Sequence, residues 1–253
     1  MIRATHISKS FGDKAVLNDV STEFYPGKTN LIIGRSGTGK TVLLKLLVGL
    51  LNPTEGNVYY GDADFFRLNK KEKRQIRMKV GMLFQSSALF DSMSVEENIR
   101  FPLDMFTNDT AKEKNKRVDY CLERVNLTGV NQRYPSEISG GMQKRVGIAR
   151  AIVLDPEYLF CDEPNSGLDP KTAILIDELI RSITLEKNIT TVINTHDMNS
   201  VMEIGENIIL LHQGQIVWRG NKDEVLETDH EILLDFIFAS PFLQRLRAAA
   251  LNK

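Results

Sequence analysis

The chain has 253 residues, of which 42% are hydrophobic and 26% are charged, so it is long enough to bury one large α/β core or two small ones. Its formal net charge of −1 gives no global positive field to attract nucleic acid or an anionic membrane. The two cysteines, Cys121 and Cys161, lack metal-like spacing and favour a reduced cytosolic setting; no signal peptide and no membrane-spanning run is expected.

The first part of the chain alternates short β-rich pieces with turns. Strands are predicted at 2–7 and 20–24, before the turn at Pro26 and Gly27. A buried strand at 31–33 leads into a glycine-rich loop and then a predicted helix at 41–50. Further strands are predicted at 57–60 and 80–84.

The glycine-rich loop consists of Gly34, Arg35, Ser36, Gly37, Thr38, Gly39, Lys40 and Thr41. This order fits G-x-x-x-x-G-K-[ST] in the strand–loop–helix context that the motif requires. Backbone N–H groups turn inward around phosphates, Lys40 adds a positive charge, and the Thr41 hydroxyl is placed for Mg²⁺. The loop therefore predicts a site for ATP and Mg²⁺; the alternative is a glycine-rich turn with an incidental lysine.

The middle of the chain is predicted to be helical. Capping boxes start helices at Ser94, with Glu97, and at Thr110, with Glu113. The basic run at 70–74 is interpreted as a solvated helix face, with lipid headgroups or an acidic loop of a partner as alternative contacts.

A second anion-binding cradle is predicted where Ser139, Gly140 and Gly141 precede a helix that runs to 152. One nucleotide rarely needs two such cradles from one chain. A head-to-tail homodimer explains both, because each ATP then lies between the Lys40 loop of one subunit and the Ser139 loop of the other. The alternative is a simple N-cap followed by flexible glycines.

From residue 158 onward, strands alternate with helices, which implies a mainly parallel sheet covered on both faces. The strand at 158–161 ends in two adjacent carboxylates. Asp162 can hold the magnesium shell, and Glu163 can polarise the attacking water as general base, although two acids at a strand end also cap loops. The apolar segment from 231 needs a surface to cover it, either on a neighbouring copy or on its own core.

With these motifs, nearly the whole chain resembles the ATP-binding cassette (ABC) family. The resemblance implies an α/β P-loop NTPase fold of ABC type, with a mainly parallel sheet core, an N-terminal antiparallel β subdomain and an inserted helical subdomain. Residues 1–230 would form a single nucleotide-binding domain, with 1–84 and 153–230 as the core and 85–152 as the helical subdomain. Residues 231–253 would form a helical tail.

The resemblance also implies roles for single residues. Phe11 would stack on adenine, Gln85 would sense the γ-phosphate and touch a membrane partner, and His196 would be the switch histidine. Lys40, Glu163, Gln85 and His196 then form the catalytic set, and Thr41, Gln85 and Asp162 the Mg²⁺ site. The dimer-interface loop would be Ser166, Gly167, Leu168 and Asp169. Departures from the family pattern are Ile138 and Met142, beside an intact Ser-Gly-Gly, and Asn165 in place of the common threonine.

The stretches 82–90 and 134–142 resemble the ATPases of Mla-type systems, which pair with an integral membrane permease and an MCE lipid-binding protein to move phospholipid between the inner and outer membranes. This implies a protein held by partner subunits at the cytoplasmic face of the inner membrane. The alternatives are another ABC importer, for an amino acid or other small solute, or a soluble ABC ATPase acting on ribosomes or DNA. A single cassette without a heptad insertion argues against the last, and no nucleic-acid partner is expected.

Overall fold

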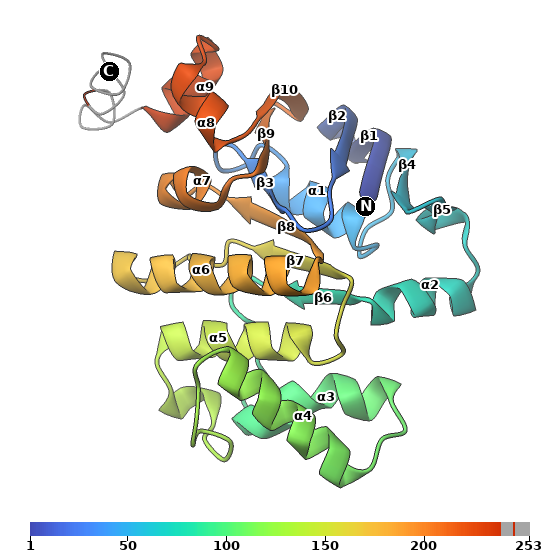
Figure 1. The fold of residues 1–253 in the computed structure, drawn as a ribbon. Coiled ribbons are helices and arrows are strands. Elements are labelled where there is room, and N and C mark those ends of the chain that lie inside the picture. Colours follow the sequence, from blue (N-terminus) through green and yellow to red (C-terminus); the bar gives the residue numbers. More distant parts are fainter. Residues whose placement is uncertain (239–244, 246–253) are drawn as a thin grey trace.

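The computed structural model describes residues 1–238 and 245 (Figure 1). The rest of the predicted tail, 239–244 and 246–253, lies outside the described residues. Among the helices of the described part, none combines the length and the apolar character needed to cross a membrane.

The central sheet has six strands in the order β10-β9-β3-β8-β7-β6. Its strands are β3 (Thr29–Ile33), β6 (Val80–Leu83), β7 (Tyr158–Asp162), β8 (Thr190–Thr195), β9 (Asn207–His212) and β10 (Gln215–Gly220). All neighbours pair in parallel except β9 and β10, which form an antiparallel hairpin. This agrees with the mainly parallel sheet that was predicted. Because β3, β7 and β8 are parallel neighbours, their carboxyl ends meet at one edge of the sheet.

A second, antiparallel sheet has the order β2-β1-β4-β5. It consists of β1 (Ile2–Phe11), β2 (Lys14–Phe24), β4 (Glu55–Tyr60) and β5 (Ala63–Asp64). The first two strands are longer than predicted because register shifts between Ala4 and Ser10 break the period of two that a regular strand would show.

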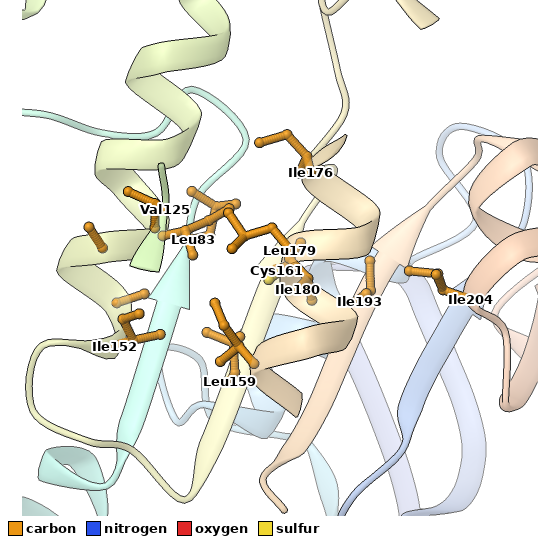
Figure 2. Close-up of a cluster of buried hydrophobic side chains, with 14 of the residues drawn as sticks. Leu83, Val125, Ile152, Leu159, Cys161, Ile176, Leu179, Ile180, Ile193 and Ile204 are labelled. Carbon is orange, nitrogen blue, oxygen red and sulfur yellow. The ribbon is translucent and has the colours of Figure 1, made fainter. Parts of the chain in front are cut away.

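Two hydrophobic cores lie on opposite faces of the six-stranded sheet. In β3, Ile32 packs into one core with α1 (Lys40–Leu47) and the antiparallel sheet, whereas Leu31 and Ile33 pack into the other. The second core, shown in part in Figure 2, joins β6, β7 and β8 to α6 (Pro170–Lys187) through Leu83, Leu159, Cys161, Ile176, Ile180 and Ile193. Successive side chains of a strand point to opposite faces, so one fully buried strand serves both cores.

The helical segment below the sheet in Figure 1 contains α3 (Val95–Phe106), α4 (Ala111–Arg124) and α5 (Gly140–Ile152). Both predicted capping boxes are present, at Ser94 with Glu97 and at Thr110 with Glu113. The basic run lies on α2 (Lys70–Met78), which buries no residue, as a solvated face predicts.

Some local elements differ from those predicted. The helix predicted at 41–50 ends at Leu47, because Gly49 adopts a left-handed backbone at φ 72° and the N–H of Leu50 donates to the Lys45 carbonyl. Three short helices were not predicted: α8 (Lys222–Glu227), which follows the hairpin, and single turns of 3₁₀-helix at Phe65–Arg67 and Pro135–Glu137. Helix α7 (Met198–Ile204) begins one residue before its predicted start. Helix α9 (Glu231–Ile237) buries Leu233 and Ile237 in the core of its own chain.

Candidate nucleotide site

The loop between β3 and α1 has the backbone of a phosphate cradle. Gly39, the N-cap of α1, has φ 104°, and no side chain caps this helix end. The first N–H groups of α1 are therefore free of a side-chain acceptor and face the loop, as anion binding at a helix N-terminus requires. A Cβ atom at Gly34 would stand 2.3 Å from the Leu211 carbonyl oxygen, so only glycine fits there.

Lys40 is buried beneath this loop. Its Nζ donates to the carbonyl oxygens of Gly34 at 2.8 Å and Arg35 at 3.1 Å. Burial lowers the pKa of Lys40, while the nearby carboxylates of Glu163 and Asp162 oppose the shift. The ammonium is thus fixed on the loop, where it adds positive charge for a bound phosphate.

Thr41 and Asp162 meet at the carboxyl edge of the sheet, and a third residue joins them. The Thr41 hydroxyl donates to Asp162 Oδ1 at 3.2 Å. Asn194, at the end of β8, donates from Nδ2 to Asp162 Oδ1 at 2.5 Å and to Thr41 Oγ1 at 3.1 Å. Asn194 is fully buried, and its own Oδ1 has no hydrogen-bond partner among the described residues.

These donors fit magnesium. Hydroxyl, carboxylate and amide oxygens are the hard ligands that Mg²⁺ takes in proteins, and the buried Asn194 Oδ1 is an oxygen without a partner at the same place. Asn194 was not predicted as a site residue. The signal in the sequence is a lone amide at the end of an otherwise buried strand.

Glu163 follows β7 in a left-handed backbone conformation with φ 50°. Its N–H donates to the Asn194 carbonyl at 2.8 Å, which fixes the chain at this point. Its carboxylate Oε2 lies 2.7 Å from Nδ1 of His196, in the loop between β8 and α7 (Met198–Ile204). The predicted base and the predicted switch histidine are therefore in direct contact.

Gln85 and the loop that begins at Ser166 lie beside this pair. Gln85 Nε2 donates to Ser166 Oγ at 3.5 Å, and the Ser166 N–H donates to the Glu163 carbonyl at 3.2 Å. Asp169, at the end of this loop, caps α6 by accepting from the Thr172 N–H and hydroxyl, and these bonds lower its pKa. Within the described chain no hydrogen bond joins Gln85 to Thr41 or Asp162, so its part in the Mg²⁺ site stays a prediction.

A cleft of about 620 Å³ unites most of these residues. Its walls are Val16, Arg35, Ser36, Gly37, Gly39, Lys40, Thr41, Val42, Gln85, Glu163, His196 and Phe236. Three of these were not predicted as site residues: Val16, Val42 and, from α9, Phe236. Phe11 does not line the cleft; it is 48% exposed, and Lys9 Nζ lies 5.0 Å from the centre of its ring. Its stacking on adenine stays a prediction.

Ser139, Gly140 and Gly141 are also absent from the walls of this cleft. They form the start of α5, where Ser139 Oγ accepts from the Met142 N–H at 3.3 Å. A Cβ atom added at Gly140 would meet nothing within 4 Å. At Gly141 an added Cβ atom would stand 2.8 Å from Thr172 Cγ2 of α6. Ser139 and Gly140 are exposed, and none of the three residues lines the cleft that contains Lys40.

The comparisons with known proteins agree with this geometry. The family model described as "ABC transporter" matches residues 17–166. The chain is 38% identical to the probable ribonucleotide transport ATP-binding protein mkl of Mycobacterium leprae, over 93% of this chain and 68% of that protein. It is also 38% identical to the methionine import ATP-binding protein MetN of Campylobacter jejuni, over 96% of this chain and 77% of that protein. It is 35% identical to the chloroplastic protein TRIGALACTOSYLDIACYLGLYCEROL 3 of Arabidopsis thaliana, over 95% of this chain and 74% of that protein.

Among solved structures, the dimer of the ATP-binding cassette MJ0796 in a post-hydrolysis state with ADP and Pi is similar, with a TM-score of 0.80 and 31% identity over 88% of this chain and 99% of that one. A second dimeric structure of the same cassette gives a TM-score of 0.81. The predicted fold class, a P-loop NTPase of ABC type, is confirmed.

Proposed function

This chain belongs to the ABC transporter family and is an ATPase. From that premise we propose that two copies of the chain close around two ATP molecules. Their ATP hydrolysis drives phospholipid transport through a membrane permease that works with an MCE protein. One observation carries the dimer. The cleft gathers Lys40, Glu163 and His196 but not the Ser139 loop, so a second copy supplies the cradle that the first lacks.

In this proposal the chain's own residues divide the work of hydrolysis. The Gly34–Thr41 loop and Lys40 hold the phosphates, and Thr41, Asp162 and Asn194 would hold Mg²⁺, which when bound neutralises charge on the phosphate oxygens. Glu163 polarises the water that attacks the γ-phosphorus and accepts its proton. His196 orients the Glu163 carboxylate through their 2.7 Å contact, and the leaving group is ADP.

The docking of the permease is proposed for the surface formed by Phe90, Phe101 and Met105, hereafter the docking surface. Phe90 is 43% and Met105 55% exposed, and the rings of Phe90 and Phe101 lie 5.0 Å apart. Exposed apolar side chains that gather in one place mark a contact surface. The docking surface begins five residues after Gln85, so a partner bound there adjoins the nucleotide cleft and holds the ATPase at the cytoplasmic face of the inner membrane.

Phospholipid as cargo is supported by the resemblance of 82–90 and 134–142 to Mla-type ATPases. The names of the relatives refer to ribonucleotide, methionine, sulfate or thiosulfate, and a glycolipid. Import of a small solute is therefore the second candidate function.

Purification of the complex from detergent-solubilised membranes distinguishes phospholipid transport from import of a small solute. A permease with an MCE protein, and ATP turnover stimulated by phospholipid, is the expected result; a solute-binding protein in their place would redirect the assignment.

The dimer is tested with Glu163→Gln. This change removes the base and keeps the cradle, so ATP should stay bound and the subunit should elute as a dimer when ATP and Mg²⁺ are present. Turnover should fall by about 100-fold or more. Adding Ser139→Glu to Glu163→Gln places a negative charge at the second cradle and should restore the monomer. A Glu163→Gln protein that binds ATP and remains monomeric would contradict the proposal.

A further inference from the structure

Helix α5, which begins at the Ser139 loop, lies directly against the loop that follows β6. Gly147 packs against the side chains of Leu83, at the end of β6, and Ser87, in this loop: an added Cβ atom would stand 2.7 Å from Leu83 Cδ1 and 3.4 Å from Ser87 Cβ. On the same face, Arg150 donates to the carbonyl oxygens of Ser87 at 2.5 Å and Ala88 at 2.7 Å. The helix therefore holds the backbone of this loop closely.

Lys144 occupies the turn of α5 nearest the hydrolytic centre. It is only 5% exposed, and its Nζ donates to the carbonyl oxygen of Gln85 and, at 3.3 Å, to that of Glu163. Burial lowers the pKa of Lys144, while the charges of Glu163 and Asp162 oppose the shift. A buried ammonium is costly unless it is well bonded, and the carbonyl oxygens of Gln85 and Glu163 supply such bonds.

The Glu163 carbonyl is a point where the backbone needs support. Glu163 adopts φ 50°, and a left-handed conformation of a residue other than glycine persists only when its surroundings fix it. The Glu163 N–H donates to the Asn194 carbonyl of β8, and the Glu163 carbonyl accepts from the Ser166 N–H. Lys144 adds a hydrogen bond from α5 to the Glu163 carbonyl oxygen, and the same ammonium donates to the carbonyl oxygen of Gln85.

We propose that Lys144 is a positioning residue that ties the helix behind the Ser139 loop to the hydrolytic Glu163 and to Gln85 of the same chain. The inference rests on the proposed dimer. In that dimer the Ser139 loop at the start of α5 closes on the ATP of the partner. Lys144, five residues after Ser139, holds the base that acts on the chain's own ATP. Closure over one nucleotide is thereby linked to hydrolysis of the other.

The first test replaces Lys144 with methionine, which keeps the length of the side chain and removes the donors. Lys144→Met should lower kcat by about 10- to 100-fold, as misplacement of a catalytic group does, and should change ATP affinity by less than about 3-fold. Lys144→Arg, which keeps a cation at the carbonyls, should recover most of the loss. Normal kcat in Lys144→Met, or an equal loss in ATP affinity, would overturn the proposal.

The second test asks on which ATP Lys144 acts. Dimers are assembled from two differently tagged copies of the full chain within the transporter complex, and one copy carries Glu163→Gln so that only the other can hydrolyse ATP. Lys144→Met is then placed either in the copy with the intact Glu163 or in its partner. Single-turnover hydrolysis should fall by about 10-fold or more in the first arrangement and by less than about 2-fold in the second.

This arrangement separates positioning from damage to the helix. Because the Ser139 loop serves the ATP of the other copy, a Lys144→Met change that merely distorted α5 would slow the second arrangement at least as much as the first, and that outcome would overturn the proposal. The Glu163→Gln, Lys144→Met double variant should still dimerise with ATP. If Glu163→Gln alone dimerises while Lys144→Met keeps full turnover, only the inference about Lys144 fails; if Glu163→Gln alone stays monomeric, the proposed dimer fails.

Discussion

Lys40 and Phe11, both predicted to bind the nucleotide, lie in very different surroundings. Lys40 is buried and fixed on the carbonyls of the phosphate loop, whereas Phe11 is half exposed and outside the cleft. Charge-assisted hydrogen bonds to phosphate are worth about 1.5–3 kcal/mol each. Stacking adds only about 0.5–1.5 kcal/mol beyond the burial of area.

We therefore expect Lys40→Ala to weaken ATP binding by about 100-fold or more and Phe11→Ala by at most about 10-fold. Titration of each variant with ATP and Mg²⁺ measures the two losses. Lys45→Ala is the matched control, because Lys45 lies on the last turn of the same helix and does not line the cleft. Equal losses for Lys40→Ala and Phe11→Ala would contradict this ranking.

Asp177 is a buried carboxyl whose pKa burial raises to about 6. It accepts from the Ser200 hydroxyl at 2.7 Å, and Ser200 accepts from Asn165 Nδ2 at 3.0 Å. Its Oδ1 and that of Asn165 are buried without a hydrogen-bond partner among the described residues. This cluster links the Ser166 loop, α6 and α7. Because burial disfavours the charged form of Asp177, a protonated carboxyl or an amide at position 177 is more stable there than a carboxylate.

The sign of the pH effect follows from the two states of Asp177. Between about pH 4 and pH 6 the folded chain keeps a proton that the unfolded chain has lost, so stability falls as the pH rises through this window, by up to about 3 kcal/mol. Asp177→Asn should raise the free energy of unfolding at pH 7.5, and the gain should vanish near pH 4. Denaturant unfolding across this range measures it; a gain independent of pH would contradict the assignment.

At the scale of elements, the loop after β6 connects the nucleotide cleft to the proposed docking surface on helix α3. The loop begins at Gln85 beside the cleft and continues to Phe90, whose N–H donates to Asn98 Oδ1 of α3 at 2.8 Å. Buried Asn98 in turn donates to the Phe90 carbonyl at 3.1 Å. These bonds fix Phe90 at the surface, so a partner that binds the docking surface meets a rigid element.

Phe90→Asp should therefore disrupt assembly with the permease and leave the fold intact. We expect the amount of permease that co-purifies to fall by about 10-fold or more, as loss of a central aromatic contact implies, while the melting temperature of the isolated subunit stays unchanged. Leu185→Asp is the control, since Leu185 is 52% exposed at the far end of α6. Equal loss in both variants would place the contact elsewhere.

At the scale of the whole molecule, helix α9 packs into the fold of its own chain. Leu233 is fully buried and Ile237 is 2% exposed in the same core as α6 and β8. The preceding α8 contributes Val225 to this core. The part of the tail that the structure describes thus packs on its own core, which was one of the two arrangements expected from the sequence.

Leu233→Ala should destabilise the monomer by about 2–4 kcal/mol, because it removes a fully buried side chain. Ile232→Ala, one residue away and 36% exposed, should cost less than about 1 kcal/mol. Thermal or denaturant unfolding without nucleotide measures both. If Leu233→Ala left the monomer unchanged and weakened only the ATP-dependent dimer, the helix would belong to the interface instead.

The sequence by itself determined the features that a few consecutive residues encode. The phosphate loop, the capping boxes at Ser94 and Thr110, and the adjacent Asp162 and Glu163 were predictable because each depends on local backbone geometry and near neighbours. The alternation of strands and helices predicted the parallel sheet for the same reason. The ends of helices were predicted less accurately: α1 ends at Leu47, before Gly49, although the apolar pattern of its sequence continues to residue 51.

Only the tertiary structure decided which distant residues meet. Asn194 reaches Asp162 across 32 positions of sequence because β7 and β8 are neighbours in the sheet. Lys144 reaches Gln85 across 59 positions because Gly147 lets α5 lie on the loop after β6. Strand order and helix packing depend on the burial of the whole core, which no single motif specifies. The lone amide of Asn194 could therefore be noticed in the sequence, but its partner Asp162 could not be read from it, and neither could the contact of Lys144 with Gln85.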